Sequence, residues 1–167
     1  AYHGKQGGIL TKNGAIIQEA LDARARGVLF DIGHGVASFS LRVFEKAFAK
    51  GFDCDMISTD LHRENYEGPV YNLAAVASKV IGCGESLEDA ISKCTSVPAR
   101  HYGLKGIGEL AVGFTGDLNI MEFAPCEEAV VDSIGDSLIL HHKLVLKKTV
   151  YSRGDESEVF EHGTGKQ

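Results

Sequence analysis

Apolar residues recur along the first two thirds of the chain in blocks that alternate between helical and strand-like spacing. Residues 15–26 carry small and apolar side chains along one helical face, and Gly27 is positioned to end that helix. A short apolar strand is predicted over 28–32. The same alternation then predicts a helix that begins at an N-cap Ser38, runs to Lys50 and stops at Gly51, followed by a strand over 56–59. Two more helices are predicted, one over 70–81 that begins near Pro69 and one from Ser86 to Cys94. Alternating strands and helices predict an α/β fold with parallel strands.

The pattern changes after about residue 106, where short apolar stretches are separated by glycines and a proline. The last third therefore reads as β-rich, with turns at positions such as Pro125 and Gly135. The predicted strands are 109–112, 117–123, 129–132, 138–140 and 144–151. Residues 155–167 are polar and contain glycine, which predicts a flexible tail.

Two of the apolar stretches end abruptly in polar, ionisable residues. The first runs into Asp31 and His34, and the second runs into Asp60 and His62. The carboxyl ends of parallel strands meet at one edge of a sheet, which is where α/β proteins carry their chemistry. From the residues alone, Asp60 either serves that chemistry or caps the segment that follows it, a common role for Asp after a strand.

Composition narrows the class of protein. The 167 residues are 44% hydrophobic and 24% charged, which fits one ordered domain or a large piece of a bigger one. A net charge of −6 argues against nucleic acid as a partner, and no apolar run reaches the roughly 20 residues of a membrane helix. The start at Ala1, without an initiator Met or a signal-peptide pattern, reads as a chain cut from something longer or as a processed terminus.

The cysteines argue against both a structural zinc site and a disulfide framework. Cys54, Cys83, Cys94 and Cys126 are widely spaced and form no Cys-x-x-Cys pair. We expect them to be reduced and mostly buried in a cytoplasmic protein.

Read in order, a series of short motifs resembles the C-terminal part of the amidohydrolase superfamily, in the branch of deacetylase-like and dihydroorotase-like metallohydrolases. The resemblance extends to about residue 120 and is specific in order and spacing. The matching residues are Tyr2–Lys5, Phe30–Gly35, Ser38–Ser40, Ile57–His62, Gly68–Val70, Ser78–Lys79, Thr95, Pro98–Ala99, Gly108–Gly113 and Gly116–Leu118.

The resemblance implies the C-terminal part of a (β/α)8 TIM-type barrel followed by strands of a small β-sandwich. Residues 1–106 would supply the last β/α units, 107–154 the sandwich strands and 155–167 the tail. Such enzymes bind one or two divalent metals, here expected to be Zn2+, at the mouth of the barrel. On this alignment 28–32 is strand 7 and 56–59 is strand 8, so Asp60 takes the position of the last metal ligand. The other ligands, including a His-x-His pair and a Lys, lie outside this chain.

The resemblance assigns Asp60 a double role as metal ligand and catalytic carboxylate. A carboxylate beside the metal can accept the proton of the attacking water and later return it to the leaving nitrogen. His34, His62 and Arg63 are the predicted substrate-binding residues, since Arg offers a bidentate fork for a carboxylate group. For His34 an anchoring role in a tight strand-to-helix turn is the equal alternative, and for Arg63 a solvated loop position is the alternative.

Other motifs carry no chemistry in this interpretation. Adjacent strand residues such as His141 and His142 point to opposite faces and are poorly placed to chelate one ion. The glycines of 103–108 fit neither a phosphate-loop pattern nor a strand-then-helix context.

Three hypotheses for function follow. The first is the C-terminal portion of a metal-dependent amidohydrolase acting on an N-acyl, O-acyl or cyclic amide bond of a small molecule, homo-oligomeric when complete. The second is a non-catalytic fragment that acts as a structural half. Because a barrel needs about 250 residues, either role requires the missing N-terminal half or a complementary chain to cover the open strands. A free-standing doubly wound α/β binding domain is the third and weakest.

Overall fold

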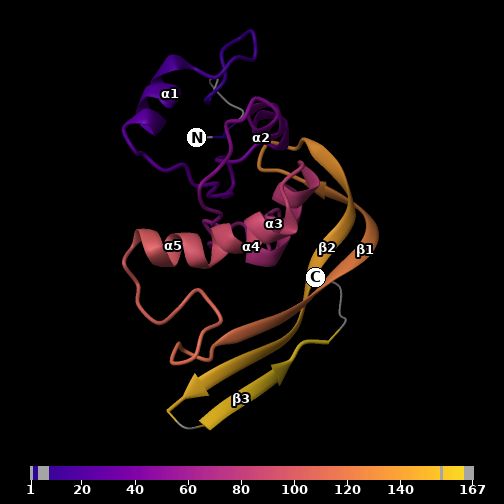
Figure 1. Cartoon of the computed structure of the whole chain (residues 1–167). Coiled ribbons are helices and arrows are strands. Elements are labelled where there is room, and N and C mark those ends of the chain that lie inside the picture. Colours follow the sequence, from indigo (N-terminus) through magenta and orange to yellow (C-terminus); the bar gives the residue numbers. More distant parts are fainter. Residues whose placement is uncertain (1, 4–7, 155, 164–167) are drawn as a thin grey trace.

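The computed structural model describes residues 2–3, 8–154 and 156–163. Helices come first along the chain and an antiparallel sheet comes last (Figure 1). The elements are α1 (Gln18–Ala25), α2 (Leu41–Phe48), α3 (Leu73–Gly82), α4 (Leu87–Cys94), α5 (Ser96–His101), β1 (Leu118–Val131), β2 (Ser137–Arg153) and β3 (Glu156–Glu161). The predicted change from α/β to β-rich sequence is thus confirmed.

The helix ends follow from local capping chemistry. Ser86 begins α4 as predicted, because its hydroxyl accepts the backbone N–H of Asp89 at 3.0 Å. Gly27 and Gly51 follow α1 and α2 with φ of +87° and +74°, the left-handed conformation that glycine adopts at low cost.

Two predicted helix starts were wrong by a few residues. The N-cap of α2 is Ser40 rather than Ser38, and α3 begins after Asn72 rather than near Pro69. Both observed caps have an extended backbone, which places the side-chain oxygen beside the N–H three residues later, at 3.3 Å and 2.9 Å respectively. Helix α5 was not predicted, and Pro98 lies in its first turn, where a missing N–H costs nothing.

The predicted strands 28–32 and 56–59 lie side by side and run parallel. A parallel bridge joins Asp31 to Met56, and the N–H of Ile32 donates to the Met56 carbonyl at 3.1 Å. The regular pairing is shorter than predicted and amounts to this bridge and its neighbouring hydrogen bonds. It nevertheless brings the carboxyl ends of both segments to one edge, as the sequence indicated.

The β-rich third forms one meander rather than many short strands. β1 and β2 pair antiparallel over nearly their whole length, and the predicted turn at Pro125 is instead a register shift within β1. Residues 109–112, predicted as a strand, form bends and turns.

The predicted tail was wrong for residues 156–161, which form β3. This strand pairs with the end of β2, Glu161 lying opposite Lys148. The remaining tail residues 155 and 164–167 lie outside the described residues.

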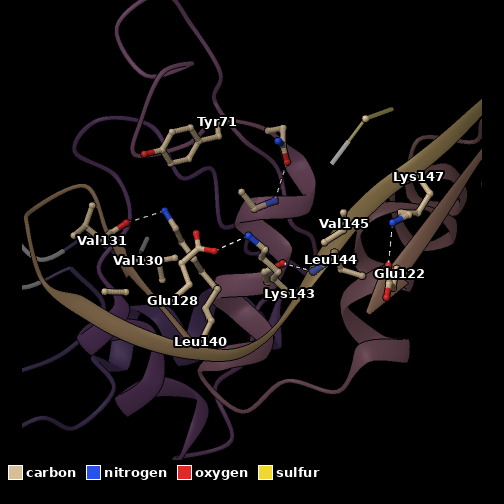
Figure 2. A pocket seen from close by; sticks show the side chains of 16 residues that line it. Tyr71, Glu122, Glu128, Val130, Val131, Leu140, Lys143, Leu144, Val145 and Lys147 are labelled. Carbon is tan, nitrogen blue, oxygen red and sulfur yellow. Dashed lines mark hydrogen bonds and ion pairs between the residues drawn. The ribbon is translucent and has the colours of Figure 1, made fainter. Parts of the chain in front are cut away.

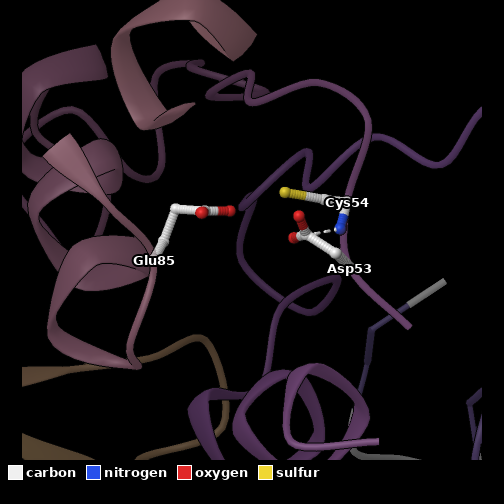
Figure 3. A group of neighbouring side chains, drawn as sticks. All are labelled: Asp53, Cys54 and Glu85. Carbon is white, nitrogen blue, oxygen red and sulfur yellow. Dashed lines mark hydrogen bonds between the residues drawn. The ribbon is translucent and has the colours of Figure 1, made fainter. Parts of the chain in front are cut away.

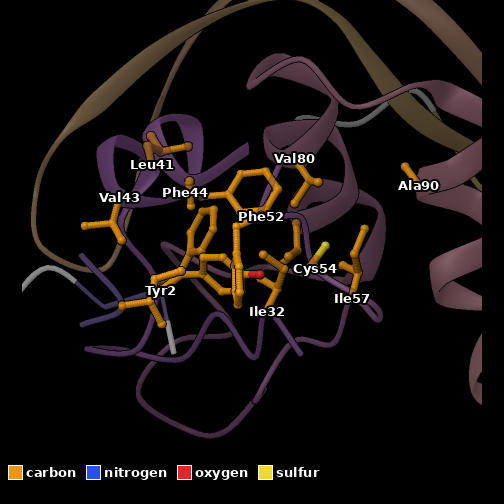
Figure 4. Close-up of a cluster of buried hydrophobic side chains, with 14 of the residues drawn as sticks. Tyr2, Ile32, Leu41, Val43, Phe44, Phe52, Cys54, Ile57, Val80 and Ala90 are labelled. Atoms are coloured by element: carbon orange, nitrogen blue, oxygen red, sulfur yellow. The ribbon is translucent and has the colours of Figure 1, made fainter. Parts of the chain in front are cut away.

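The core lies between α2, α3 and the parallel segments (Figure 4). Tyr2, Phe39 and Phe44 are fully buried, and the Phe44 ring meets the Tyr2 ring edge-on at a centroid distance of 5.2 Å. Helix α3 also packs against β2, where a Cβ on Gly82 would lie 2.6 Å from a methyl carbon of Leu140. The glycine therefore permits the close approach that fixes the sheet against the helical part.

Two further predictions concern the chain as a whole. The four cysteines are free, as predicted, and burial raises the pKa of Cys83 to about 12 and that of Cys94 to about 11. Among the helices of the described residues, none combines the length and apolar character needed to cross a bilayer.

Candidate functional site

Asp60 lies where the second parallel segment ends, at the edge we term the carboxyl edge (residues 33–35 and 59–60). Its backbone has φ of +49°, a left-handed conformation that costs an L-residue about 1–2 kcal/mol, less for Asp than for most. Its side chain is exposed. A strained residue that presents a carboxylate at the end of a strand is a candidate for function.

Gly35 provides the space that the Asp60 carboxylate occupies. A Cβ on Gly35 would lie only 2.5 Å from Oδ2 of Asp60, closer than non-bonded atoms tolerate. The N–H of Gly35 donates to the Thr59 carbonyl at 3.0 Å, which holds the two turns together. At the carboxyl edge, the missing side chain of Gly35 in the first segment therefore leaves space for the Asp60 carboxylate of the second segment.

His34 is completely buried beneath this edge. Its Nδ1 donates to the Gly35 carbonyl at 3.0 Å, and its Nε2 accepts from the Nζ of Lys79 at 2.9 Å. Because a carbonyl can only accept, the ring is neutral with its proton on Nδ1. Burial first, and then the Lys79 charge, lower the pKa of His34 to about 4. The ring thus makes the contacts of an anchor for the turn.

His62 and Arg63 lie in the loop that follows Asp60, and both are exposed. The loop is organised by Asn65, which is fully buried. The Asn65 side chain donates to the Asp60 carbonyl at 2.8 Å and accepts from the N–H of His62 at 2.8 Å. The loop therefore holds Asp60 in its left-handed conformation while presenting the two predicted substrate-binding residues to solvent.

A carboxylate below the carboxyl edge faces away from the core. Ile32 and Ile57 are buried in the core. Their neighbours in the sequence, Asp31 and Ser58, lie on the opposite face, where the Ser58 hydroxyl donates a hydrogen bond to the Asp31 carboxylate. Oδ1 of Asp31 is buried and has no hydrogen-bond partner among the described residues, and burial raises the pKa of this carboxyl group. The face opposite the core is thus polar below Asp60.

The opposite end of the parallel segments holds the group of Asp53, Cys54 and Glu85, whose ligand atoms all lie within 4.8 Å of one another (Figure 3). A metal does not fit there, because the Lys93 ammonium bridges the carboxylates of Asp53 and Glu85. The group is therefore a structural ion-pair cluster, in which Lys93 offsets part of the charge of the two carboxylates.

A cavity of about 500 Å3 lies between α3 and the β1–β2 hairpin (Figure 2). Ion pairs join Lys143 to Glu128 at 2.6 Å and Lys147 to Glu122 at 3.1 Å beside it. Its lining residues do not include Asp60. They do include Lys79, which bonds to His34 of the carboxyl edge, so the cavity reaches the supports of that edge but not the Asp60 carboxylate.

Sequence reasoning missed Asn65 and Lys79 as organising residues. Lys79 left a usable signal, since it is a lone charge in the apolar stretch 73–82. Asn65 left none, because a polar residue in a polar loop is unremarkable until its burial is known.

The comparisons with known proteins agree with this geometry. A model of the amidohydrolase family matches residues 36–153, and the chain belongs to that family. Among curated proteins, a deacetylase of Enterococcus faecalis is 36% identical over 151 residues, which is 89% of this chain and 41% of the relative. A deacetylase of Brucella anthropi is 33% identical over 135 residues, covering 81% and 34% respectively.

Solved structures show the same relationship. The structure of an adenine deaminase superposes with a TM-score of 0.89 at 34% identity, covering 96% of this chain and 43% of its own. A dihydroorotase structure gives a TM-score of 0.79 at 31% identity, covering 96% and 41%. The chain therefore spans less than half the length of these relatives, and the family predicted from the motifs is confirmed.

Proposed function

We propose that this chain is the C-terminal portion of a metal-dependent amidohydrolase that cleaves an N-acyl, O-acyl or cyclic amide bond of a small molecule. The observation that carries the proposal is Asp60, an exposed carboxylate in a left-handed backbone at the carboxyl edge, with Gly35 making room for it. Similarity to proteins named deacetylase, adenine deaminase and dihydroorotase supports this reaction class.

In this proposal the segments 28–32 and 56–59 are the last two strands of a (β/α)8 barrel, and β1–β3 belong to the accompanying β-sandwich. Their parallel pairing supports it. So does the division of faces, with Ile57 packed toward the helices and Ser58 turned away from them, as alternation along a barrel strand requires.

We propose that the carboxyl edge contributes to a site for a divalent cation, Zn2+, because the exposed Asp60 carboxylate is a suitable ligand there. Asp60 is the ligand that this chain supplies, and the remaining ligands come from outside residues 1–167. A bound divalent cation lowers the pKa of water toward 7 and polarises the scissile carbonyl group. Asp60 would accept the proton of the attacking water on a carboxylate oxygen and deliver it to the leaving nitrogen of an amide or the leaving oxygen of an ester.

His62 and Arg63 are placed to bind substrate, because their exposed side chains follow Asp60 in a loop fixed by Asn65. Arg63 suits a carboxylate group on the substrate. For His34 the burial and the two occupied ring nitrogens favour the anchoring alternative.

The alternative function is a non-catalytic structural half. Large exposed apolar side chains such as Leu110 (84% exposed) and Val112 favour a chain that another polypeptide segment covers. Both functions require another segment to cover these side chains, so measurements of bound zinc and of catalytic activity must distinguish the enzyme from the structural half.

The test uses the complete natural polypeptide that contains this chain, assayed with zinc on N-acetyl amino acids, an O-acetyl ester and a cyclic amide. Asp60→Asn should lower kcat by about 100- to 10,000-fold, the range for a lost general base, and reduce the zinc bound per molecule. Asp22→Asn, on the exposed face of α1, is the matched control and should change neither. Full activity of Asp60→Asn would refute the proposed role. Tight stoichiometric zinc in the 167-residue chain alone would refute the external ligands.

A further inference from the structure

Lys79 is a buried lysine whose ammonium group bonds no carboxylate among the residues that the structure describes. It is 1% exposed, and its Nζ lies 2.9 Å from His34 Nε2, 2.5 Å from the Pro69 carbonyl and 2.7 Å from the Val131 carbonyl. An ammonium has three N–H donors, and here each has one acceptor. The bond to Val131 appears as a dashed line in Figure 2.

These acceptors come from three separate parts of the chain. His34 precedes Gly35 on the first turn of the carboxyl edge, Pro69 belongs to the loop after Asp60, and Val131 ends β1. Lys79 on α3 therefore joins both turns of the candidate site to the sheet.

The β1–β2 turn makes a second connection to the same region. The Asp132 carboxylate accepts the N–H of Leu41 at 2.9 Å, at the start of α2. The Ser133 hydroxyl accepts the N–H of Phe39 at 3.1 Å and donates to the Phe39 carbonyl. The Phe39 ring in turn lies 5.0 Å from the His34 ring. The turn and Lys79 thus hold His34 from two sides.

We propose that Lys79 is a positioning residue, which acts through His34 and the Pro69 loop to hold Gly35 and Asp60 in register at the carboxyl edge. The path runs from the ammonium to His34 Nε2, from Nδ1 to the Gly35 carbonyl, and from the Gly35 backbone to the Asp60 carboxylate in contact with it. This inference rests on the proposed role of Asp60.

The test compares Lys79→Met and Lys79→Gln with Lys93→Met in the complete natural polypeptide. Methionine keeps the unbranched stem without the charge, and glutamine keeps an N–H donor. Lys93 is the matched control, because it is also buried but bridges Asp53 and Glu85 at the opposite end of the segments.

Lys79→Met should lower kcat by about 10- to 100-fold, the usual effect of losing a supporting residue, with KM changed less than about 2-fold. Lys79→Gln should recover part of that loss. In metal-free protein, Lys79→Met should speed amide hydrogen exchange at residues 33–38 and 60–71. Lys93→Met should speed exchange at 52–56 and 84–94 while leaving kcat of the folded fraction unchanged.

Two outcomes overturn the proposal: a folded Lys79→Met variant with wild-type kcat and exchange, or a Lys93→Met variant that loses as much kcat. If neither Lys79 variant folds, amide hydrogen exchange of the wild-type protein tests the proposal instead. The hydrogen-bonded amides of Asn65, Gly68, Val70 and Tyr71 must then exchange as slowly as those of α3, and their exchange at the rate of exposed loop amides refutes the anchor. If Asp60→Asn is fully active, the proposed function fails instead, whatever Lys79 does.

Discussion

Replacing Asp60 by glycine should change stability in opposite directions with and without metal. The perturbation removes the Cβ that makes φ of +49° unfavourable, together with the carboxylate proposed to bind the cation. Within the described part of the chain no hydrogen bond engages that carboxylate, so the metal-free protein loses little by its removal.

The magnitudes follow from two opposing contributions. A left-handed backbone costs an L-residue about 1–2 kcal/mol, with Asp at the lower end, whereas glycine costs about 0.5–1 kcal/mol because its unfolded chain has more entropy to lose. The metal-free Asp60→Gly variant should therefore be at least as stable as the wild type, with a gain of up to about 0.5 kcal/mol. At zinc of about 100 times Kd the wild type gains about 2.7 kcal/mol, whereas a variant with about 100-fold weaker binding gains about 0.4 kcal/mol. With zinc, the wild type should lead by more than about 1 kcal/mol.

Urea unfolding of the complete natural polypeptide, in chelator and in zinc, measures both differences. Asp60→Ala is the control, since it keeps the Cβ in the left-handed region and should lack the gain in chelator. A glycine variant less stable than wild type in chelator refutes the strain, and equal zinc stabilisation of both proteins refutes the ligand role.

Two further predictions concern the support of the carboxyl edge. Because burial lowers the pKa of His34 from 6.5 to about 4, the unfolded chain takes up a proton below pH 6.5 that the folded state takes up only near pH 4. The free energy of unfolding should therefore decrease as the pH is lowered from 6.5 to 4, and His34 accounts for about 3 kcal/mol of that decrease. Urea unfolding at pH 6.5 and 4.5 should show a shallower dependence for His34→Asn but not for the exposed His141→Asn, and equal slopes would contradict the assignment. Asn65→Ala removes both side-chain hydrogen bonds of a buried residue and should cost about 1–3 kcal/mol with faster exchange at 60–71; unchanged exchange there would show that the loop does not depend on it.

Local chemistry was predictable where a few neighbouring residues decide the structure. The cap at Ser86 and the stops at Gly27 and Gly51 depend on residues within one turn, and the structure has them as predicted. The choice between Ser38 and Ser40 does not. The N–H of Ser40 donates to the Tyr2 carbonyl at 2.9 Å, a contact with a distant segment that fixes the extended backbone of the cap.

Pairing across the sheet was the least predictable feature, because cross-strand partners can override local turn signals. Pro125 reads as a turn in the sequence, yet β1 continues past it through a register shift opposite β2. Residues 155–167 read as a tail because they are mostly polar and contain glycine, and pairing with β2 is what makes residues 156–161 a strand. Neither outcome has a local signature.

The two ends of the parallel segments also differ in whether their carboxylates are paired with a positive charge. At one end the Lys93 ammonium forms ion pairs with the carboxylates of Asp53 and Glu85. At the other, Asp60 is exposed on a strained backbone. A protein that gained only stability from this residue would favour glycine there, since the left-handed turn needs no carboxylate. The exposed carboxylate at this strained position therefore supports the cation site proposed for the carboxyl edge.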